Sequence, residues 1–261
     1  MAEVNPTGLD AYKPTEIADL VEAAGVAKAN LGFARMLTLA TLACAFIALG
    51  AAAYTMVMTG VDPGFGPARF LGGVVFSLGL ILVIVGGAEL FTGNALMVMA
   101  TVDGKISASQ LGRNWAIVYL GNFIGSIAIA AAMSMTGILD GAAGHTAAVI
   151  AEGKAHLSPL QAFVRGALCN TLVCLAVWLT IAARTVTGKI LAIIWPIAGF
   201  VLLGFEHSVA NMYLIPQGML GGATVGFGGF IQNLVFVTLG NIVGGAGGVA
   251  LAYRLAYGPR A

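Results

Sequence analysis

Six long apolar stretches, separated by short polar segments, set the pattern of this 261-residue chain. A helix needs about 20 apolar residues to cross the hydrocarbon core of a bilayer, and each stretch is long enough. The stretches cover residues 31–59, 69–101, 109–136, 159–183, 190–219 and 230–256. The pattern therefore predicts an all-α membrane protein with six transmembrane helices.

Composition supports this prediction and excludes other classes. Hydrophobic residues make up 59% of the chain, charged residues make up 9%, and the mean hydropathy is +0.95, values typical of a polytopic membrane protein. The net charge of +1 gives no reason to expect a nucleic-acid partner. Cys44, Cys169 and Cys174 lie within apolar stretches and lack the spacing of metal ligands, so we expect neither a metal nor a cofactor.

Charged residues predict the orientation in the membrane. The first 28 residues carry five acidic side chains, unlike the basic start of a cleavable signal peptide, so the amino terminus should stay in the cytosol. Nine Lys and Arg residues then lie on the cytosolic side and only Arg69, Lys154 and Arg165 lie outside, which satisfies the positive-inside rule. We expect a multi-pass protein of a prokaryotic-type cytoplasmic membrane with both termini in the cytosol.

Two polar motifs interrupt the second and fifth apolar stretches. Glu89 stands five residues before Asn94, and Glu206 stands five residues before Asn211. A charged side chain near the bilayer centre costs about 2.5–3.5 kcal/mol, so these motifs must face protein or water. We interpret all four residues as polar support, with the two glutamates accepting hydrogen bonds from backbone N–H groups freed by a break in each helix.

Glycine and proline residues beside the motifs favour such breaks. Gly86, Gly87 and Gly93 flank the first motif, whereas Gly204 and Pro216 flank the second. Both spans can therefore leave helical geometry close to the motif. Non-helical backbone at this depth is tolerated only against protein or a water-filled path, which points to a transport pathway.

The chain also contains an internal duplication. Residues 35–44 parallel 165–174, the two Glu-x4-Asn motifs correspond, and the Asn114-x7-Asn122 pattern parallels 233–241. Each half has three spans, an odd number, so the halves must be inverted relative to each other, as in many transporters. Glycines at four-residue spacing, such as Gly121 and Gly125, predict close helix packing in the third span of each half.

These observations predict a linear organisation in five parts. The amphipathic pattern of Ile17, Leu20, Val21 and Ala24 predicts a short helix on the inner membrane surface within a cytoplasmic segment. The parts are a cytoplasmic segment at 1–28, a first three-helix repeat at 29–136, an extracytoplasmic connecting loop at 137–157, a second repeat at 158–257 and a cytoplasmic tail at 258–261.

Three runs of sequence resemble the formate/nitrite transporter family: GAELFTGN at 87–94, GALCNTLVCLAVW at 166–178 and GFEHSVANM at 204–212. The resemblance extends over all six spans. It implies an aquaporin-like fold with broken second and fifth helices, a homopentamer in the lipid bilayer with one pore in each protomer, and no enzymatic activity. The expected partners are protons and small monovalent anions, namely formate, nitrite or hydrosulfide.

The resemblance also implies roles for individual residues. The central histidine of the family corresponds to His207, its loop threonine to Thr92, its fourth-span asparagine to Asn170 and its outer vestibule lysine to Lys154. The apolar constrictions correspond to Leu80, Leu90, Phe91 and Phe200, with Phe76 nearby.

Residue chemistry suggests how such a pore would work. An ion transferred into a dry interior carries an idealised cost of order 20 kcal/mol. Protonating an acid of pKa about 3.5 at pH 7 costs only about 5 kcal/mol. We therefore expect the anion to pass with a proton or as its neutral acid, with Lys154 concentrating anions, Thr92 and Asn170 orienting the substrate or the ring, and His207 donating or stabilising the proton.

Other functions remain open at this level. Formate is favoured over nitrite by the outer lysine and by the 215–218 segment, which are closer to formate members of the family. A neutral-solute channel of the aquaporin type would share the topology, but neither Asn94 nor Asn211 is followed by Pro-Ala. A membrane-embedded enzyme is disfavoured because Glu206 and His207 are adjacent and cannot both face one catalytic metal. His207 could also be a neutral buried histidine that merely satisfies hydrogen bonds.

Overall fold

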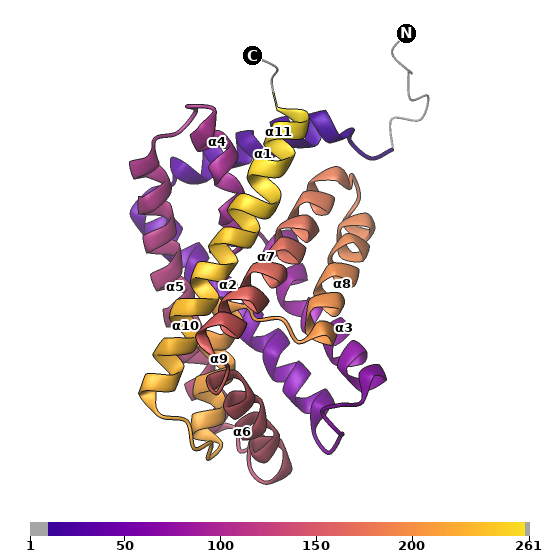
Figure 1. The fold of residues 1–261 in the computed structure, drawn as a ribbon, viewed down its shortest axis with the longest axis vertical. Coiled ribbons are helices and arrows are strands. Elements are labelled where there is room, and N and C mark those ends of the chain that lie inside the picture. The colour runs from indigo at the N-terminus through magenta and orange to yellow at the C-terminus, as the bar shows by residue number, and fades with distance from the viewer. Residues whose placement is uncertain (1–9, 259–261) are drawn as a thin grey trace.

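A computed structural model describes residues 10–258, all of the described elements being helical (Figure 1). The first nine residues of the expected 1–28 segment and the last three of the expected tail lie outside the described residues. The elements are α1 (Pro14–Ala29), α2 (Phe33–Met58), α3 (Gly66–Gly86), η1 (Gly93–Met97), α4 (Val98–Val102), α5 (Ala108–Met135), α6 (Ala142–Ala155), α7 (Pro159–Ala182), α8 (Val186–Leu203), α9 (Ser208–Leu220), α10 (Phe227–Ile242), η2 (Val243–Leu251) and α11 (Ala252–Tyr257).

The predicted six-span helical fold is confirmed. Within the described residues, six helical segments are long and apolar enough to cross a membrane, the last being the continuous run Phe227–Tyr257. α1, α4 and α11 lie at the end of the bundle where the described part of the chain begins and ends, whereas α6 lies at the opposite end (Figure 1). We call these the terminal end and the far end.

Both predicted helix breaks are present. Gly87 caps the end of α3 with φ +81°, and the chain turns through residues 88–92 before η1 begins. Gly204 caps the end of α8 with φ +70°, and residues 205–207 lead into α9. Glycine occupies both positions because left-handed backbone is strained for other residues. The expectation that Pro216 also breaks its span is wrong, because Pro216 lies inside α9.

Glycines bring the first and third spans of each half into close contact, as the four-residue spacing predicted. A Cβ atom at Gly121 or Gly125 of α5 would collide with α2, and one at Gly240 or Gly244 would collide with α7. Helices that associate in a bilayer rely on small residues of this kind. The contact holds α2 against α5 and α7 against the α10–η2 run.

The duplication is visible in hydrogen bonds, but its register differs from the one predicted. Glu89 N donates to Leu39 O, and Glu206 N donates to Arg165 O. Leu39 is therefore the structural counterpart of Arg165, so the predicted alignment of residues 35–44 with 165–174 is wrong by four residues. Chemically similar letters recur at helical spacing, and an alignment shifted by one turn keeps the same face toward the neighbours.

Within the described part of the chain, α1 and α6 lie outside the six apolar stretches that the sequence predicted. α1 forms where the amphipathic pattern predicted a helix, and Ile17 and Val21 are buried against protein, whereas Leu20 is exposed. α6 occupies most of the expected connecting loop. It contacts α9, and a Cβ atom at Gly218 of α9 would collide with Ala147 and Ala151 of α6. The two helices can therefore approach closely because Gly218 has no side chain.

Candidate functional site

The two broken segments meet inside the bundle through Thr92 and His207. Thr92 Oγ1 lies 2.9 Å from His207 Nε2, and both side chains are buried. His207 also caps α9, because its Nδ1 accepts a hydrogen bond of 3.1 Å from Ala210 N. An Nδ1 that accepts carries no proton, so in the neutral ring the proton is on Nε2. Nε2 then donates to Thr92, whose own hydroxyl proton remains available for another acceptor.

Two equivalent asparagines hold the broken segments in place. Asn122 accepts from Phe91 N at 2.9 Å and donates to the carbonyl of Glu89. Asn241 accepts from Ser208 N at 2.9 Å and donates to the carbonyl of Glu206. Freed backbone groups at this depth are thus satisfied by amide side chains, which removes a cost of about 1–3 kcal/mol for each unpaired group.

Asn170 supports the backbone next to Thr92 and His207, which we call the central pair. Its Nδ2 donates to the Thr92 carbonyl at 3.1 Å and to the Asn241 carbonyl at 2.6 Å. The side chain therefore fixes the backbone that carries Thr92. Neither of these two hydrogen bonds involves the His207 ring. Gly245 leaves room for this amide, because a Cβ atom there would collide with Asn170 Nδ2.

Each Glu-x4-Asn motif closes a ring of four side chains with a lysine. In the terminal-end ring, Glu89 accepts from Lys28 at 2.7 Å and from Asn94 at 2.8 Å. Asn94 also donates to Asn114 at 2.9 Å, and Asn114 donates back to the Lys28 carbonyl at 3.4 Å. The ring neutralises a carboxylate that would otherwise be buried and unpaired.

The far-end ring repeats this pattern in the second half of the chain. Glu206 accepts from Lys154 at 3.0 Å and from Asn211 at 2.6 Å. Asn211 donates to Asn233 at 2.8 Å, and Asn233 donates to the Lys154 carbonyl at 2.9 Å. The Glu89 and Glu206 side chains thus accept from lysine and asparagine side chains. Among the described residues no backbone N–H donates to either carboxylate, unlike the expectation that they accept from backbone groups freed by the helix breaks.

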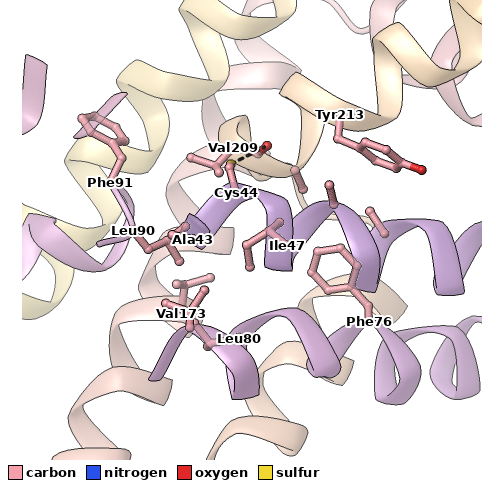
Figure 2. Packing of buried hydrophobic residues seen from close by; sticks show 14 of the residues in the cluster. Ala43, Cys44, Ile47, Phe76, Leu80, Leu90, Phe91, Val173, Val209 and Tyr213 are labelled. Carbon is pink, nitrogen blue, oxygen red and sulfur yellow. Dashed lines mark hydrogen bonds between the residues drawn. The ribbon is translucent and has the colours of Figure 1, made fainter. Parts of the chain in front are cut away.

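Apolar side chains surround the central pair. Leu80 and Leu90 lie together beside Ala43 and Val173 (Figure 2). Phe76 lies one turn before Leu80 on α3. The Phe200 ring stacks on His207 at 6.0 Å between centroids and meets the Phe76 ring edge-on at 5.8 Å. All these side chains are almost fully buried.

Phe91 differs from the other expected constriction residues. Its side chain lies apart from Leu80 and Leu90 (Figure 2), and its ring contacts Tyr119 at 4.9 Å and Trp115 at 5.9 Å. Phe91 is thus held against α5, and its contacts give it a packing role in this conformation.

Two cavities open at opposite ends of the bundle, and the one at the far end reaches His207. The far vestibule, of about 590 Å³, reaches from the surface to His207 and the rings of Phe76 and Phe200, and Lys154 lines it. The terminal vestibule, of about 390 Å³, is lined by Lys28 and Glu89. Thr92, Leu80 and Leu90 line neither cavity and are buried.

Several residues in this arrangement were not predicted as site residues. Lys28 is the counterpart of Lys154, yet the sequence shows it only as one of several basic residues before the first span. The repeated Asn-x7-Asn patterns were recognised as duplicated without a role, although they contribute to both rings and hold both broken segments. Duplication of a polar residue inside apolar spans was the signal that could have identified them.

The site offers hydrogen-bond donors but no metal centre. Among residues 10–258 no group of three or more His, Cys, Asp or Glu side chains could hold a metal ion. Hydrogen-bond donors, a lysine at each end and apolar barriers are suited to moving a small polar solute across the membrane. The fold and the site together define a membrane channel or transporter built from two inverted three-helix repeats.

Comparison with known proteins specifies this class further. A sequence description of the formate/nitrite transporter family matches residues 15–255, and the chain belongs to this family of transport proteins, as the sequence motifs predicted. The chain is 40% identical to the formate channel FocA of Haemophilus influenzae, over 90% of this chain and 91% of that protein. It is 38% identical to the formate channel BtFdhC of Bacillus thuringiensis, over 94% and 96% respectively.

Solved structures agree with the fold. An FNT family ion channel superposes with a TM-score of 0.87 at 32% identity, covering 93% of this chain and 99% of that one. A pentameric formate channel with formate bound superposes with a TM-score of 0.79 at 42% identity, covering 86% and 97% respectively.

Proposed function

We propose that this protein carries formate across the cytoplasmic membrane together with a proton, as the neutral acid at the narrowest part of the path. The observation that carries the proposal is the buried Thr92–His207 pair between apolar side chains, with a lysine-containing vestibule on each side. Formate is favoured because relatives at 38–40% identity are named formate channels.

The apolar barrier decides the charge state in which the substrate crosses. A bare carboxylate in a dry interior costs of order 20 kcal/mol, whereas protonating formate at pH 7 costs about 5 kcal/mol. Two hydrogen-bond donors cannot offset the first cost, since each is worth about 1.5–3 kcal/mol toward a charged group. The neutral acid is therefore the form that passes Leu80 and Leu90.

The proton comes from water in the vestibule in this mechanism. A neutral His207 that protonates Nδ1 would lose the hydrogen bond from Ala210 N, which caps α9, and caps are worth about 0.5–2 kcal/mol. His207 thus stays neutral and donates through Nε2. The Thr92 hydroxyl donates a hydrogen bond to the substrate oxygen, and Asn170 holds the Thr92 backbone in position.

The terminal end is proposed to face the cytosol. Lys105 and Arg184 lie in the connections before α5 and α8, and Arg113 and Lys189 lie near the starts of these two helices, at that end. The positive-inside rule places such residues in the cytosol. The far vestibule with Lys154 then opens to the outside. A homopentamer with one pore in each protomer is proposed from the pentameric formate channel that this chain resembles.

Uptake of formate, nitrite, hydrosulfide and glycerol into proteoliposomes, each with and without an inward proton gradient, tests the proposal. Formate flux that the gradient accelerates would support it. Faster nitrite or hydrosulfide flux than formate flux would keep the mechanism and change the substrate. Glycerol flux without anion flux would contradict the proposal and return the protein to a neutral-solute channel.

A further inference from the structure

Two arginines from different helices line the far vestibule, where the carboxyl end of α8 borders it. Arg69, near the start of α3, places its Nη2 3.5 Å from the carbonyl of Val201. Arg165, on α7, places its Nη1 3.4 Å from the carbonyl of Gly204. Both arginines, Val201 and Gly204 line the far vestibule. The two guanidinium groups therefore meet at the carboxyl end of α8.

The end of α8 would repel an anion without these side chains. The carboxyl end of a helix carries a partial negative charge of about half an elementary charge, together with carbonyls that lack helical donors. Here that end borders the cavity through which an outside anion must pass. A guanidinium at each of two carbonyls cancels the partial charge and leaves an excess of positive charge at the rim.

Neither arginine is neutralised by a carboxylate. The ion pairs of residues 10–258 include Lys154 with Glu206 but none with Arg69 or Arg165. Glu206 is the one acidic residue lining the far vestibule, and Lys154 already pairs with it. Asp62, in the nearby turn, accepts from Gly64 N and does not line the cavity. The rim therefore keeps two uncompensated positive charges.

The guanidinium groups also keep most of their donors. Each has five N–H groups and makes a single long hydrogen bond to a carbonyl. Gly204 permits this arrangement, because a Cβ atom there would lie 2.7 Å from Arg69 Nη2. Planar guanidinium donors match the two oxygens of a carboxylate or of nitrite.

The terminal vestibule has no such feature. Its charged lining residues are Lys28 and Glu89, which pair with each other at 2.7 Å. The two halves of the chain have equivalent four-residue rings, but the two vestibules differ in charge. Unpaired positive charge lines the far vestibule alone, so it can attract anions from one side of the membrane.

We propose that Arg69 and Arg165 form an outer anion-capture site at the rim of the far vestibule, which binds a small monovalent oxyanion before it reaches Lys154 and the central pair. This inference rests on the proposed transport function and deepens it. The two charges raise the local anion concentration at this mouth and thereby lower the half-saturating concentration for transport from that side.

The test is initial formate uptake by right-side-out membrane vesicles at low and high ionic strength, for the wild type and the double variant Arg69→Gln/Arg165→Gln. We expect the half-saturating formate concentration of the double variant to rise about fivefold to tenfold at low ionic strength, with a maximal rate within about twofold of the wild type. The salt dependence should weaken, because salt screens the charges that the variant lacks.

Three comparisons make the result specific. Arg184→Gln removes an arginine at the terminal end and should leave uptake into right-side-out vesicles unchanged. Arg69→Lys/Arg165→Lys retains the charge and should stay within about threefold of the wild type, which also covers the case in which the glutamine variant fails to fold. Uptake into inside-out vesicles, through the terminal vestibule, should be the same in wild type and double variant.

The outcomes separate this inference from the proposed function. Unchanged half-saturation and salt dependence in the double variant would overturn the capture site while formate transport stands. An equal loss in both vesicle orientations, or a loss in the lysine variant as large as in the glutamine variant, would also overturn it. A wild type that transports neither formate nor nitrite would overturn both.

Discussion

At the scale of single residues, the geometry around His207 assigns the ring proton to Nε2, because Nδ1 accepts from Ala210 N. Thr92 then acts as the acceptor toward the ring and keeps its own proton for another partner. This order of donors makes Thr92 the residue that presents an O–H group to the substrate. A variant that tests this role should therefore remove the threonine hydroxyl and keep the volume of the side chain.

Thr92→Val should therefore reduce formate uptake about twofold to tenfold, since a hydrogen bond to a neutral substrate group is worth about 0.5–1.5 kcal/mol. The variant keeps the shape of the side chain. Thr101→Val is a matched control, because the Thr101 side chain donates only to the Met97 carbonyl four residues earlier. Initial uptake rates in proteoliposomes measure both variants, and equal rates for Thr92→Val and the wild type would contradict the assigned role.

Lys154 contributes to stability as well as to the vestibule. Lys154→Met leaves the Glu206 carboxylate buried with one donor fewer, and we expect a loss of about 2–4 kcal/mol, reduced from the fully buried case because 17% of the lysine side chain is exposed. Lys154→Met/Glu206→Gln removes both charges and should recover most of the loss. Thermal unfolding in detergent measures this, and a double variant less stable than Lys154→Met would contradict the pairing.

At the scale of elements, amide side chains connect helices that lie far apart in the sequence. Asn241 of α10 joins the carbonyls of Gly166 and Glu206 to the N–H of Ser208. These contacts hold the segment between α8 and α9 at the depth where His207 meets Thr92. The corresponding asparagine, Asn122, does the same for the segment between α3 and η1.

Asn241→Ala should lower stability by about 3 kcal/mol or more, because three buried backbone groups lose their partner at about 1–3 kcal/mol each with partial relaxation. Formate uptake should fall with it, since His207 loses its support. Gln232→Ala, on the same helix but exposed, is the control. A shift in the thermal midpoint no larger than that of the control would contradict the role of Asn241.

The docking of α1 depends on a cluster of charged groups at the terminal end. Glu22 of α1 pairs with Lys105, and Asp103 accepts from Arg254 Nε at 2.6 Å. Burial, together with a hydrogen bond to Asp103, raises the pKa of Glu22 above its usual 4.5. The hydrogen bond from Glu22, together with Arg254, lowers the pKa of Asp103 below its usual 3.8.

These shifts predict how α1 responds to pH. Because docking raises the pKa of the Glu22 carboxyl, this group stabilises the docked helix fully at pH values below its usual pKa. The stabilisation is lost as pH rises through the raised pKa of Glu22. Asp103 acts in the opposite direction and loses its contribution only as pH falls through its lowered pKa. Hydrogen exchange of residues 14–29 in the wild type should accelerate as pH rises through the Glu22 pKa, after correction for intrinsic rates. Glu22→Gln should abolish this dependence, and an unchanged profile in the variant would contradict the assignment.

At the scale of the whole molecule, two inverted halves share a structural frame and differ at the positions that touch the path. The four-residue rings and the supporting asparagines are equivalent, whereas Leu90 of the first half stands where His207 stands in the second, each directly following its motif glutamate. One half therefore contributes an apolar barrier and the other a hydrogen-bond donor.

The sequence predicted those features that depend on composition and on local residue type. Apolar length gave the six spans, Gly87 and Gly204 gave the breaks, and the Glu-x4-Asn motifs pointed to the buried polar network. The pairing of Lys28 with Glu89 could not be predicted, because it joins residues 61 positions apart. The helix α6 was also missed, since its alanine-rich segment is neither strongly apolar nor strongly amphipathic.

Assembly belongs to the same scale. Large hydrophobic side chains such as Trp195, Leu203 and Leu255 are exposed on a single chain. Lipid and neighbouring protomers both cover such surfaces in a pentamer. Native mass spectrometry from detergent should yield five copies of this chain, and a monomer as the largest stable species would contradict the proposed assembly.

The net charge that crosses with each formate distinguishes the neutral acid from the bare anion. Proteoliposomes that hold the purified protein would be clamped at defined potentials while formate uptake, internal pH and current are recorded together. We predict that one proton is taken up with each formate and that formate causes no net current. A formate-dependent current that carries one negative charge per formate, with no change of internal pH, would show that the bare anion crosses and would contradict the proposed mechanism.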